Sequence, residues 1–151
     1  HTALRRQRQM CIRDRKLVIQ NNLNKQTRVM ADGAALKIIL TNFISNAIKH
    51  SPKKACINIE ESFSSKGYVR LSVSDEGKGV PKKYKERVFE RFYRIDKGRS
   101  TEKGGTGLGL SISKNLALMM GYSVGVESNK PKGATFFIDI KIDDEKSFQA
   151  A

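Results

Sequence analysis

The sequence contains no tryptophan, three prolines and two cysteines, and 7% of its residues are aromatic. Two cysteines exclude a disulfide-rich scaffold, and no group of cysteines and histidines has the spacing of a zinc site. No uninterrupted apolar run approaches the roughly 18 residues of a membrane-spanning helix, so we expect a soluble chain. Acidic residues are scarce too: 15 stand against 29 Lys and Arg among 151 residues, a net charge of +14. That charge is typical of proteins that bind nucleic acids or membranes, so its distribution along the chain matters.

Part of this charge lies in a segment that looks foreign. The run Arg5 to Arg15 resembles one translated reading frame of a sequencing-library adapter, and His1 to Leu4 fit the adjoining index. A non-native segment carries no information about the fold of the protein. We therefore expect residues 1–15 to be foreign, residues 16–146 to form a domain and residues 147–151 to be a tail. The alternative is a native basic arm, whose deletion would weaken the binding of an anionic partner.

The remaining 136 residues have the size and composition of one folded domain. They carry 24 basic and 14 acidic residues, a net charge of +10. A chain of this length buries roughly 70% of the surface that it exposes when unfolded. A hydrophobic content of 38% excludes a disordered basic tail. Cys56 is the one cysteine left, which favours a reducing compartment and therefore a cytoplasmic domain.

Hydrophobic periodicity predicts one α/β domain without internal repeats. Apolar residues recur at helical spacing from Gly33 to His50. Asp32 precedes this segment as its N-cap, and Pro52 follows it. We expect further helices at residues 82–92 and 108–120, and strands at residues 16–23, 28–31, 55–59, 69–73, 122–128 and 135–142. The first two strands surround Asn24-Lys25-Gln26, and we expect them to form a hairpin.

The first long helix carries a polar stripe. Asn42, Asn46 and Lys49 follow at i, i+4 and i+7, which places them on one side of the helix. Asn oxygens suit a hard cation, and Lys can balance phosphate charge. Taken alone, the pattern fits a solvent-exposed stripe better than a binding site.

The strand at residues 69–73 leads directly into Asp75, which continues its inward-facing alternation. A carboxylate placed inward needs a donor. Gly77 and Gly79 follow, and glycines permit a close backbone approach. A buried acceptor in this setting could accept from an exocyclic amine such as that of adenine. A strand-end turn with a capping Asp explains the segment equally well.

A glycine-rich loop, Gly104 to Leu110, immediately precedes the last helix. Glycines there let backbone N–H groups and the helix N-terminus point at phosphate oxygens. The loop is neither a Walker loop, because no Gly-Lys-Ser/Thr completes it, nor a dinucleotide fingerprint, because Leu110 replaces the third glycine.

A basic stretch separates this loop from Asp75. Phe89 and Phe92 precede or flank its cations, and a Phe pair on a short helix is more often a core anchor than a functional feature. The position beside a phosphate-type loop favours a lid that faces an anion. The cations are Arg91, Arg94, Lys97, Arg99 and Lys103.

The order of these segments is more specific than any one of them. An Asn-bearing helix, Asp-x-Gly-x-Gly, paired Phe, a glycine-rich loop and a final Gly-Ala-Thr-Phe strand follow one another. Together they resemble the catalytic ATP-binding domain of sensor histidine kinases, part of a wider family with gyrase, Hsp90 and MutL. The resemblance covers residues 16–142 and is densest at residues 42–51, 89–94 and 105–110. It implies a two-layer α/β sandwich: a mixed, mostly antiparallel sheet of about five strands, covered on one face by about three helices, with a mobile ATP lid.

The resemblance also implies roles for individual residues. It makes Asn46 a Mg²⁺ ligand at the ATP phosphates and Asp75 the acceptor of the adenine amine. The residues implied to contact ATP are Asn46, Lys49, His50, Asp75, Gly77, Gly79, Phe89, Phe92, Gly105, Thr106, Gly107, Leu108, Gly109 and Thr135. Those implied to take part in phosphoryl transfer are Asn42, Asn46, Lys49 and Arg94. One departure is Gly133-Ala134-Thr135, where Gly-Thr is commoner in the family.

Asn42 bears on the kind of transfer. In relatives that hydrolyse ATP or phosphorylate serine, the residue four before the metal-binding Asn is typically a Glu base. Water or a serine hydroxyl must lose a proton to attack phosphorus, whereas a neutral imidazole already has a lone pair. Asn at this position therefore favours transfer to histidine.

The acceptor histidine is expected outside this chain. His50 belongs to the nucleotide motif, so the acceptor should lie on an upstream dimerisation domain of a longer parent. The expected cofactors are ATP and Mg²⁺, and the expected partners are that domain and a response regulator, without nucleic acid. We expect the fragment to be monomeric and its parent to be a homodimer. A sensor anchored in the inner or plasma membrane is one candidate for that parent.

Two other functions stay open. A degenerate sensor could hold ATP or dock partners without transfer, although intact Asn46 and Asp75 argue against degeneration. A basic nucleic-acid-binding domain has only the charge in its favour. Residues 78–103 carry ten basic and four acidic side chains, so the excess gathers around the expected lid.

Overall fold

The computed structural model describes residues 9–12, 16–93, 108–129 and 132–143. Its strands are β1 (Gln9–Ile12), β2 (Leu17–Asn21), β3 (Cys56–Phe63), β4 (Tyr68–Ser74), β5 (Ser123–Ser128) and β6 (Ala134–Lys141). Its helices are α2 (Gly33–His50) and α3 (Gly109–Met119), with 3₁₀ turns at Lys82–Tyr84 and Arg87–Phe89.

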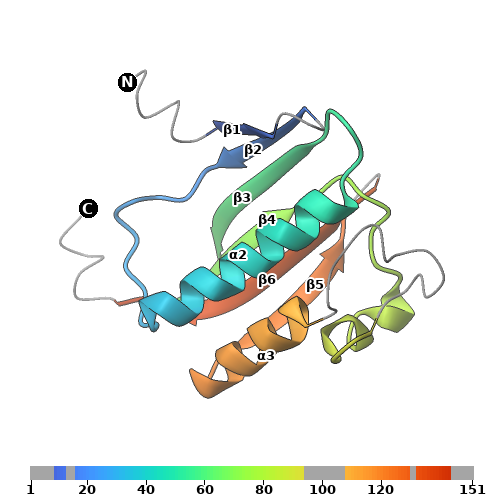
Figure 1. The fold of residues 1–151 in the computed structure, drawn as a ribbon. Helices are drawn as coiled ribbons and strands as arrows, with labels where there is room; N and C mark the ends of the chain where they lie inside the picture. Colours follow the sequence, from blue (N-terminus) through green and yellow to red (C-terminus); the bar gives the residue numbers. More distant parts are fainter. Residues whose placement is uncertain (1–8, 13–15, 94–107, 130–131, 144–151) are drawn as a thin grey trace.

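The described strands form one mixed sheet in the order β1-β2-β3-β4-β6-β5. Only the β2–β3 pair is parallel, and the other four pairs are antiparallel. Helices α2 and α3 lie side by side on the same face of the sheet (Figure 1). The two-layer α/β sandwich with a mostly antiparallel sheet is therefore confirmed. Among the described residues, no helix is long and apolar enough to cross a membrane.

Helix α2 forms where its capping residue and apolar spacing predict it. The Asp32 side chain accepts from the backbone N–H of Ala35 at 3.0 Å, which satisfies one donor of the first turn. Ile39, Phe43 and Ala47, spaced by four residues, are buried against the sheet. The helix ends at His50, as expected ahead of Pro52.

The strands alternate between the helix-covered face and an open face. Inward-facing residues of the three central strands form the core: Ile57 and Ile59 of β3, Val69, Leu71 and Val73 of β4, and Phe136, Ile138 and Ile140 of β6. Phe136 lies between two aromatic rings, 5.8 Å from Phe43 and 5.9 Å from Phe89 between ring centroids. The core therefore joins α2, the sheet and the second 3₁₀ turn.

The expected hairpin at residues 16–31 is wrong. Strand β2 pairs instead in parallel with β3, and Val29 makes a single antiparallel bridge with Ile142. Pairing with β3 buries Leu17 and Ile19 in the sheet, which a two-stranded hairpin at the surface could not do.

Two further differences concern local structure. The expected helix at residues 82–92 is two separate 3₁₀ turns, because its few apolar residues do not sustain a helical stripe. Residues 9–12, inside the segment expected to be foreign, form edge strand β1. An edge pairing uses backbone groups that every sequence possesses, so this strand leaves the origin of residues 1–15 a prediction.

Candidate functional site

Asp75 stands directly after β4, where the start of β6 closes over it. The side chain is 4% exposed. Its Oδ1 accepts from the backbone N–H of Gly77 at 2.9 Å and from that of Ala134 at 3.1 Å. The backbone also pairs, since Asp75 N donates to Ala134 O at 2.9 Å. Within the described part of the chain, Oδ2 makes no hydrogen bond, so a buried carboxylate keeps one oriented acceptor.

The protonation of Asp75 reflects its burial. Burial raises the pKa of the carboxyl above its ordinary value, because the ionised form loses hydration. The N–H groups of Gly77 and Ala134, and then the charge of His50, act in the opposite direction and lower the pKa. The carboxylate is therefore held in place by donors that favour its charged form.

The turn after Asp75 needs its glycines. A Cβ atom on Gly77 would lie 2.4 Å from the carbonyl oxygen of His50, so only glycine lets this turn reach the end of α2. Gly79 has φ +79°, and its Cβ would lie 2.8 Å from the carbonyl oxygen of Gly133. Both predicted site glycines thus serve to pack the backbone around Asp75.

Thr135 lies one residue beyond Ala134 on β6. It lies on the open face of β6, where its hydroxyl bonds Asn129 Oδ1 and lies 2.8 Å from Ser74 Oγ. The neighbouring Ala134 is the residue buried beside the Asp75 carboxylate. Contact between Thr135 and a nucleotide stays a prediction.

Asn129 is a site residue that sequence reasoning missed. Its Nδ2 donates to the carbonyl oxygen of Asp75 at 3.1 Å, and its backbone N–H donates to Gly133 O at 2.9 Å. An Asn at a strand end resembles many turn residues. The bond to Asp75 depends on the order of β4, β6 and β5, which no local signal reveals.

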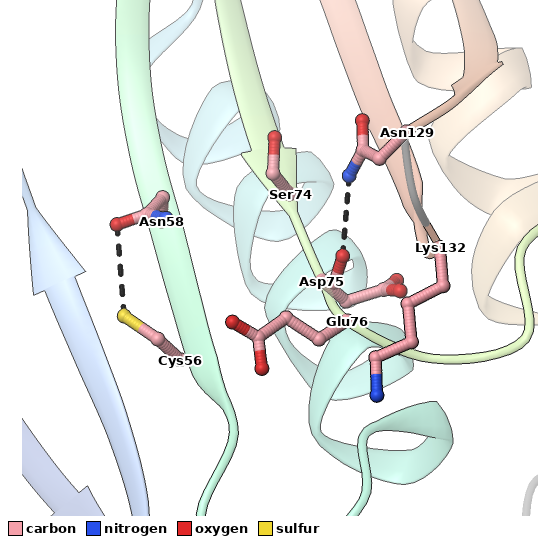
Figure 2. A pocket seen from close by; sticks show the side chains of 7 residues that line it. All are labelled: Cys56, Asn58, Ser74, Asp75, Glu76, Asn129 and Lys132. Carbon is pink, nitrogen blue, oxygen red and sulfur yellow. Dashed lines mark hydrogen bonds between the residues drawn. The ribbon is translucent and has the colours of Figure 1, made fainter.

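A cavity of about 450 Å³ lies next to Asp75, on the face of the sheet opposite the helices (Figure 2). Figure 2 shows Asn129 and Lys132 on one side of Asp75 and Cys56 and Asn58 on the other. Burial, followed by the charge of Glu76, raises the pKa of the Cys56 thiol. The lining residues are Cys56, Asn58, Ser74, Asp75, Glu76, Asn129 and Lys132.

The C-terminal end of α2, where the polar stripe ends, lies beside the turn after Asp75. Asn46 is half-buried, and its side chain makes no hydrogen bond to any residue of the described ranges. Lys49 and His50 belong to the last turn, where cations complement the helix dipole. The close contact between His50 and the Gly77 turn brings this helix end to Asp75.

Asn42 contacts α3 instead of pointing into solvent. Its Nδ2 donates to Gly109 O at 3.1 Å and to Ser113 Oγ at 3.2 Å. Gly109 is the first residue of α3, and Leu108 is its N-cap, which makes no side-chain capping bond. The structure thus brings the predicted residues Asn42, Leu108 and Gly109 together.

The two predicted phenylalanines differ. Phe89 is 6% exposed and meets Phe136 edge to face, so it anchors the core. Phe92 is 63% exposed and has φ +63°, a conformation that bulky residues rarely adopt. The expected lid loop lies outside the described residues. So do four predicted site residues: Arg94, Gly105, Thr106 and Gly107.

Known proteins are similar to this chain in sequence and in fold. The family described as "Histidine kinase-, DNA gyrase B-, and HSP90-like ATPase" matches residues 31–144. Sensor histidine kinase WalK of Bacillus subtilis is 37% identical over 134 residues, 85% of this chain and 21% of WalK. Sensor-like histidine kinase SenX3 of Mycolicibacterium smegmatis is 41% identical over 113 residues, 75% of this chain and 29% of SenX3. The chain thus spans less than a third of the length of these two relatives.

Solved structures of histidine kinases have the same fold as this chain. Full-length ShkA in complex with AMPPNP superposes with a TM-score of 0.72 at 32% identity, over 85% of this chain and 26% of ShkA. The catalytic domain of histidine kinase ThkA superposes with a TM-score of 0.67 at 27% identity, over 85% of this chain and 79% of that domain. The chain therefore belongs to the histidine kinase-, DNA gyrase B- and HSP90-like ATPase family, as a catalytic domain of the sensor histidine kinase type.

Proposed function

We propose that this domain binds ATP and, in its parent protein, transfers the γ-phosphoryl group to a histidine on a separate dimerisation domain. The buried carboxylate of Asp75, with one oxygen held by two amides and the other open, carries the proposal. The AMPPNP complex of the relative ShkA supports it.

Asp75 would select the base. Adenine presents an exocyclic amine, which donates to an ionised acceptor such as Asp75 Oδ2. Guanine presents a carbonyl oxygen at the corresponding ring position, and two acceptors facing each other repel. The site should therefore prefer ATP to GTP.

The phosphates would lie between α2 and the start of α3. Asn46 and Lys49 approach from α2, and the first turn of α3 offers backbone N–H groups that the Leu108 side chain does not cap. An uncapped helix N-terminus carries partial positive charge and favours an anion. Gly105, Thr106, Gly107 and Arg94 are proposed to complete this surface.

Mg²⁺ fits the donors present. Among the described residues, no group of three His, Cys, Asp or Glu could hold a metal ion. Mg²⁺ commonly takes one or two protein oxygens and completes its shell with phosphates and water, and Asn46 supplies one such oxygen. Bound Mg²⁺ would offset phosphate charge during transfer.

Phosphoryl transfer would then need positioning more than acid–base help. A neutral imidazole nitrogen of the acceptor would form the N–P bond as the bond from Pγ to the bridging oxygen breaks and ADP leaves, and the other ring nitrogen would then release its proton to water. Because the imidazole nitrogen already has a lone pair, the nucleophile needs much less help from a base than water or a serine hydroxyl, consistent with an amide at position 42. Lys49 and Arg94 are proposed to stabilise the charge on the transferred group.

The partners follow from this scheme. The histidine kinase ThkA has been solved in complex with response regulator protein TrrA, and that structure superposes with a TM-score of 0.64 at 28% identity. We propose a response regulator as the phosphate acceptor downstream of the parent. The parent is proposed to be a homodimeric sensor with this domain in the cytoplasm.

Calorimetric titration with ATP, GTP and the Asp75→Asn variant tests the binding half. The wild-type domain should bind ATP in the presence of Mg²⁺ and should bind GTP far more weakly. The Asp75→Asn variant should no longer bind ATP. Glu127→Gln, an exposed carboxylate on β5, is the matched control and should bind normally. Binding that ignores the base or survives Asp75→Asn would contradict the site.

The transfer half is tested by adding the dimerisation domain of the parent and γ-labelled ATP. Label should appear on a histidine of that domain and not on His50. ATP binding without any transfer would identify a nucleotide-holding module instead.

A further inference from the structure

The first turn of α3 is held by its carbonyl groups. Gly109 O accepts from Asn42 Nδ2 at 3.1 Å and from Ser113 Oγ at 2.9 Å. Leu108 O accepts from Ser111 Oγ at 2.9 Å and from the N–H of Ile112 at 2.9 Å. Side chains thus fix the carbonyls of this turn, while its leading N–H groups receive no capping side chain from Leu108.

The chemistry of Asn42 settles which end of its amide faces α3. A carbonyl oxygen can only accept, so the group that faces Gly109 O must be the NH₂ group. The same NH₂ group reaches Ser113 Oγ at 3.2 Å. Both donors of Asn42 are therefore directed at α3. Ser113 is 0% exposed, so this contact is shielded from water and difficult to replace.

The contact also fixes where the first turn of α3 lies relative to Asn46 in the proposed nucleotide site. Asn46 follows Asn42 by four residues, one turn further along the same side of α2. In a helix the N–H groups point opposite to the carbonyls. Asn42 holds Gly109 by its carbonyl, so it orients the first-turn N–H groups of α3 relative to Asn46 without occupying the space in front of them.

We propose that Asn42 is a positioning residue that ties α2 to the first turn of α3, and that it acts on the nucleotide through α3 without touching metal or phosphate. This inference rests on the proposed function for its consequence in binding, but the tie itself is independent of any ligand. The opposing assignment makes Asn42 a direct ligand beside Asn46.

Asn42→Asp separates the two assignments. A carboxylate keeps the shape and can ligate Mg²⁺, but it cannot donate to Gly109 O and repels that oxygen. Ser113→Ala removes the second partner of Asn42 from within α3 and touches nothing on the phosphate side. Thr41→Ala, at an exposed position of α2, is the matched control.

The binding measurement is the affinity for ADP, with Mg²⁺ and with a chelator. Asn42→Asp should weaken ADP binding about fivefold in both conditions, the effect of one lost hydrogen bond. Ser113→Ala should weaken it in the same direction. The double variant should lose less than the product of the two factors, because both changes break one contact. The proposal would be overturned if Asn42→Asp weakened ADP binding only in the presence of Mg²⁺, if Ser113→Ala left the affinity unchanged, and if the effects of the two substitutions multiplied in the double variant.

Hydrogen exchange of the ligand-free protein tests the tie by itself. Amides at residues 109–116 should exchange about tenfold faster in Asn42→Asp than in wild type, with exchange in β3 and β4 unchanged. Unchanged exchange at residues 109–116 would refute the tie. If wild type binds no ADP, the proposed function fails, and the exchange result still decides the role of Asn42. If Asn42→Asp does not fold, Ser113→Ala gives the same readouts.

Discussion

Asp75 and Ala134 are joined twice, by Asp75 N donating to Ala134 O at 2.9 Å and by Ala134 N donating to Asp75 Oδ1 at 3.1 Å. One residue of β6 therefore holds both the backbone and the carboxylate that follow β4. Asn129 adds a third bond, to the carbonyl oxygen of Asp75. The proposed base acceptor is thus held by hydrogen bonds from the start of β6 and from the residue after β5.

Asp75→Asn should abolish ATP recognition without unfolding the domain. The amide oxygen can still accept from Gly77 and Ala134, which turns its NH₂ group toward the adenine amine and sets two donors against each other. We expect ATP affinity to fall about a hundredfold. Thermal unfolding at neutral pH should occur at the same or a higher temperature than in wild type, because a buried charge is removed. A clearly lower melting temperature would show that the carboxylate stabilises the fold.

The stability difference between wild type and Asp75→Asn should depend on pH. The folded-state pKa of Asp75 is raised above its unfolded value of about 3.9, so the native state binds this proton more tightly. The contribution of Asp75 is therefore most favourable below the unfolded pKa and is lost as pH rises through the folded pKa. Denaturant unfolding from pH 3 to pH 7 measures it. Wild type should lose stability relative to Asp75→Asn across that window, and the opposite slope would show that the hydrogen bonds outweigh burial.

Gly77→Ala should destabilise the domain by about 2 kcal/mol, the usual effect of overpacking. The added Cβ would lie 2.4 Å from a backbone oxygen of His50, which cannot move without shifting the end of α2. Gly33→Ala is the control, since a Cβ there meets nothing within 4 Å. Urea denaturation measures both variants. Equal stability of the two would indicate that the Gly77 turn can shift away from α2.

Asn129→Ala should weaken ATP binding several-fold and lower the free energy of unfolding by about 2 kcal/mol, the effect of two lost hydrogen bonds. The Asp75 carbonyl loses its Nδ2 donor, and the Thr135 hydroxyl loses its acceptor. Lys132→Ala changes the same cavity at an exposed side chain and should leave ATP affinity unchanged. Calorimetric titration of both variants decides the point, and equal affinities would show that Asn129 does not support Asp75.

Apolar spacing, capping residues and proline predicted the two long helices correctly, because these signals lie within or next to each helix. Helix α2 begins after a capping Asp32 and ends before Pro52, and its bounds agree with the prediction. Helix α3 agrees to within one residue at each end. The hairpin at residues 16–31 failed because β2 prefers a parallel partner 35 or more residues away, and sequence alternation does not name the partner.

The sequence by itself determined the inward alternation that delivers Asp75, the polar stripe on α2 and the glycine-rich approach to α3, because each depends on local periodicity. Only the tertiary structure decided what these groups meet. It placed Ala134 instead of Thr135 beside the carboxylate, brought Asn129 to the Asp75 carbonyl and directed Asn42 at Gly109. Those contacts join residues more than fifty positions apart, and the sheet order and helix packing that create them arise from burial of the whole core.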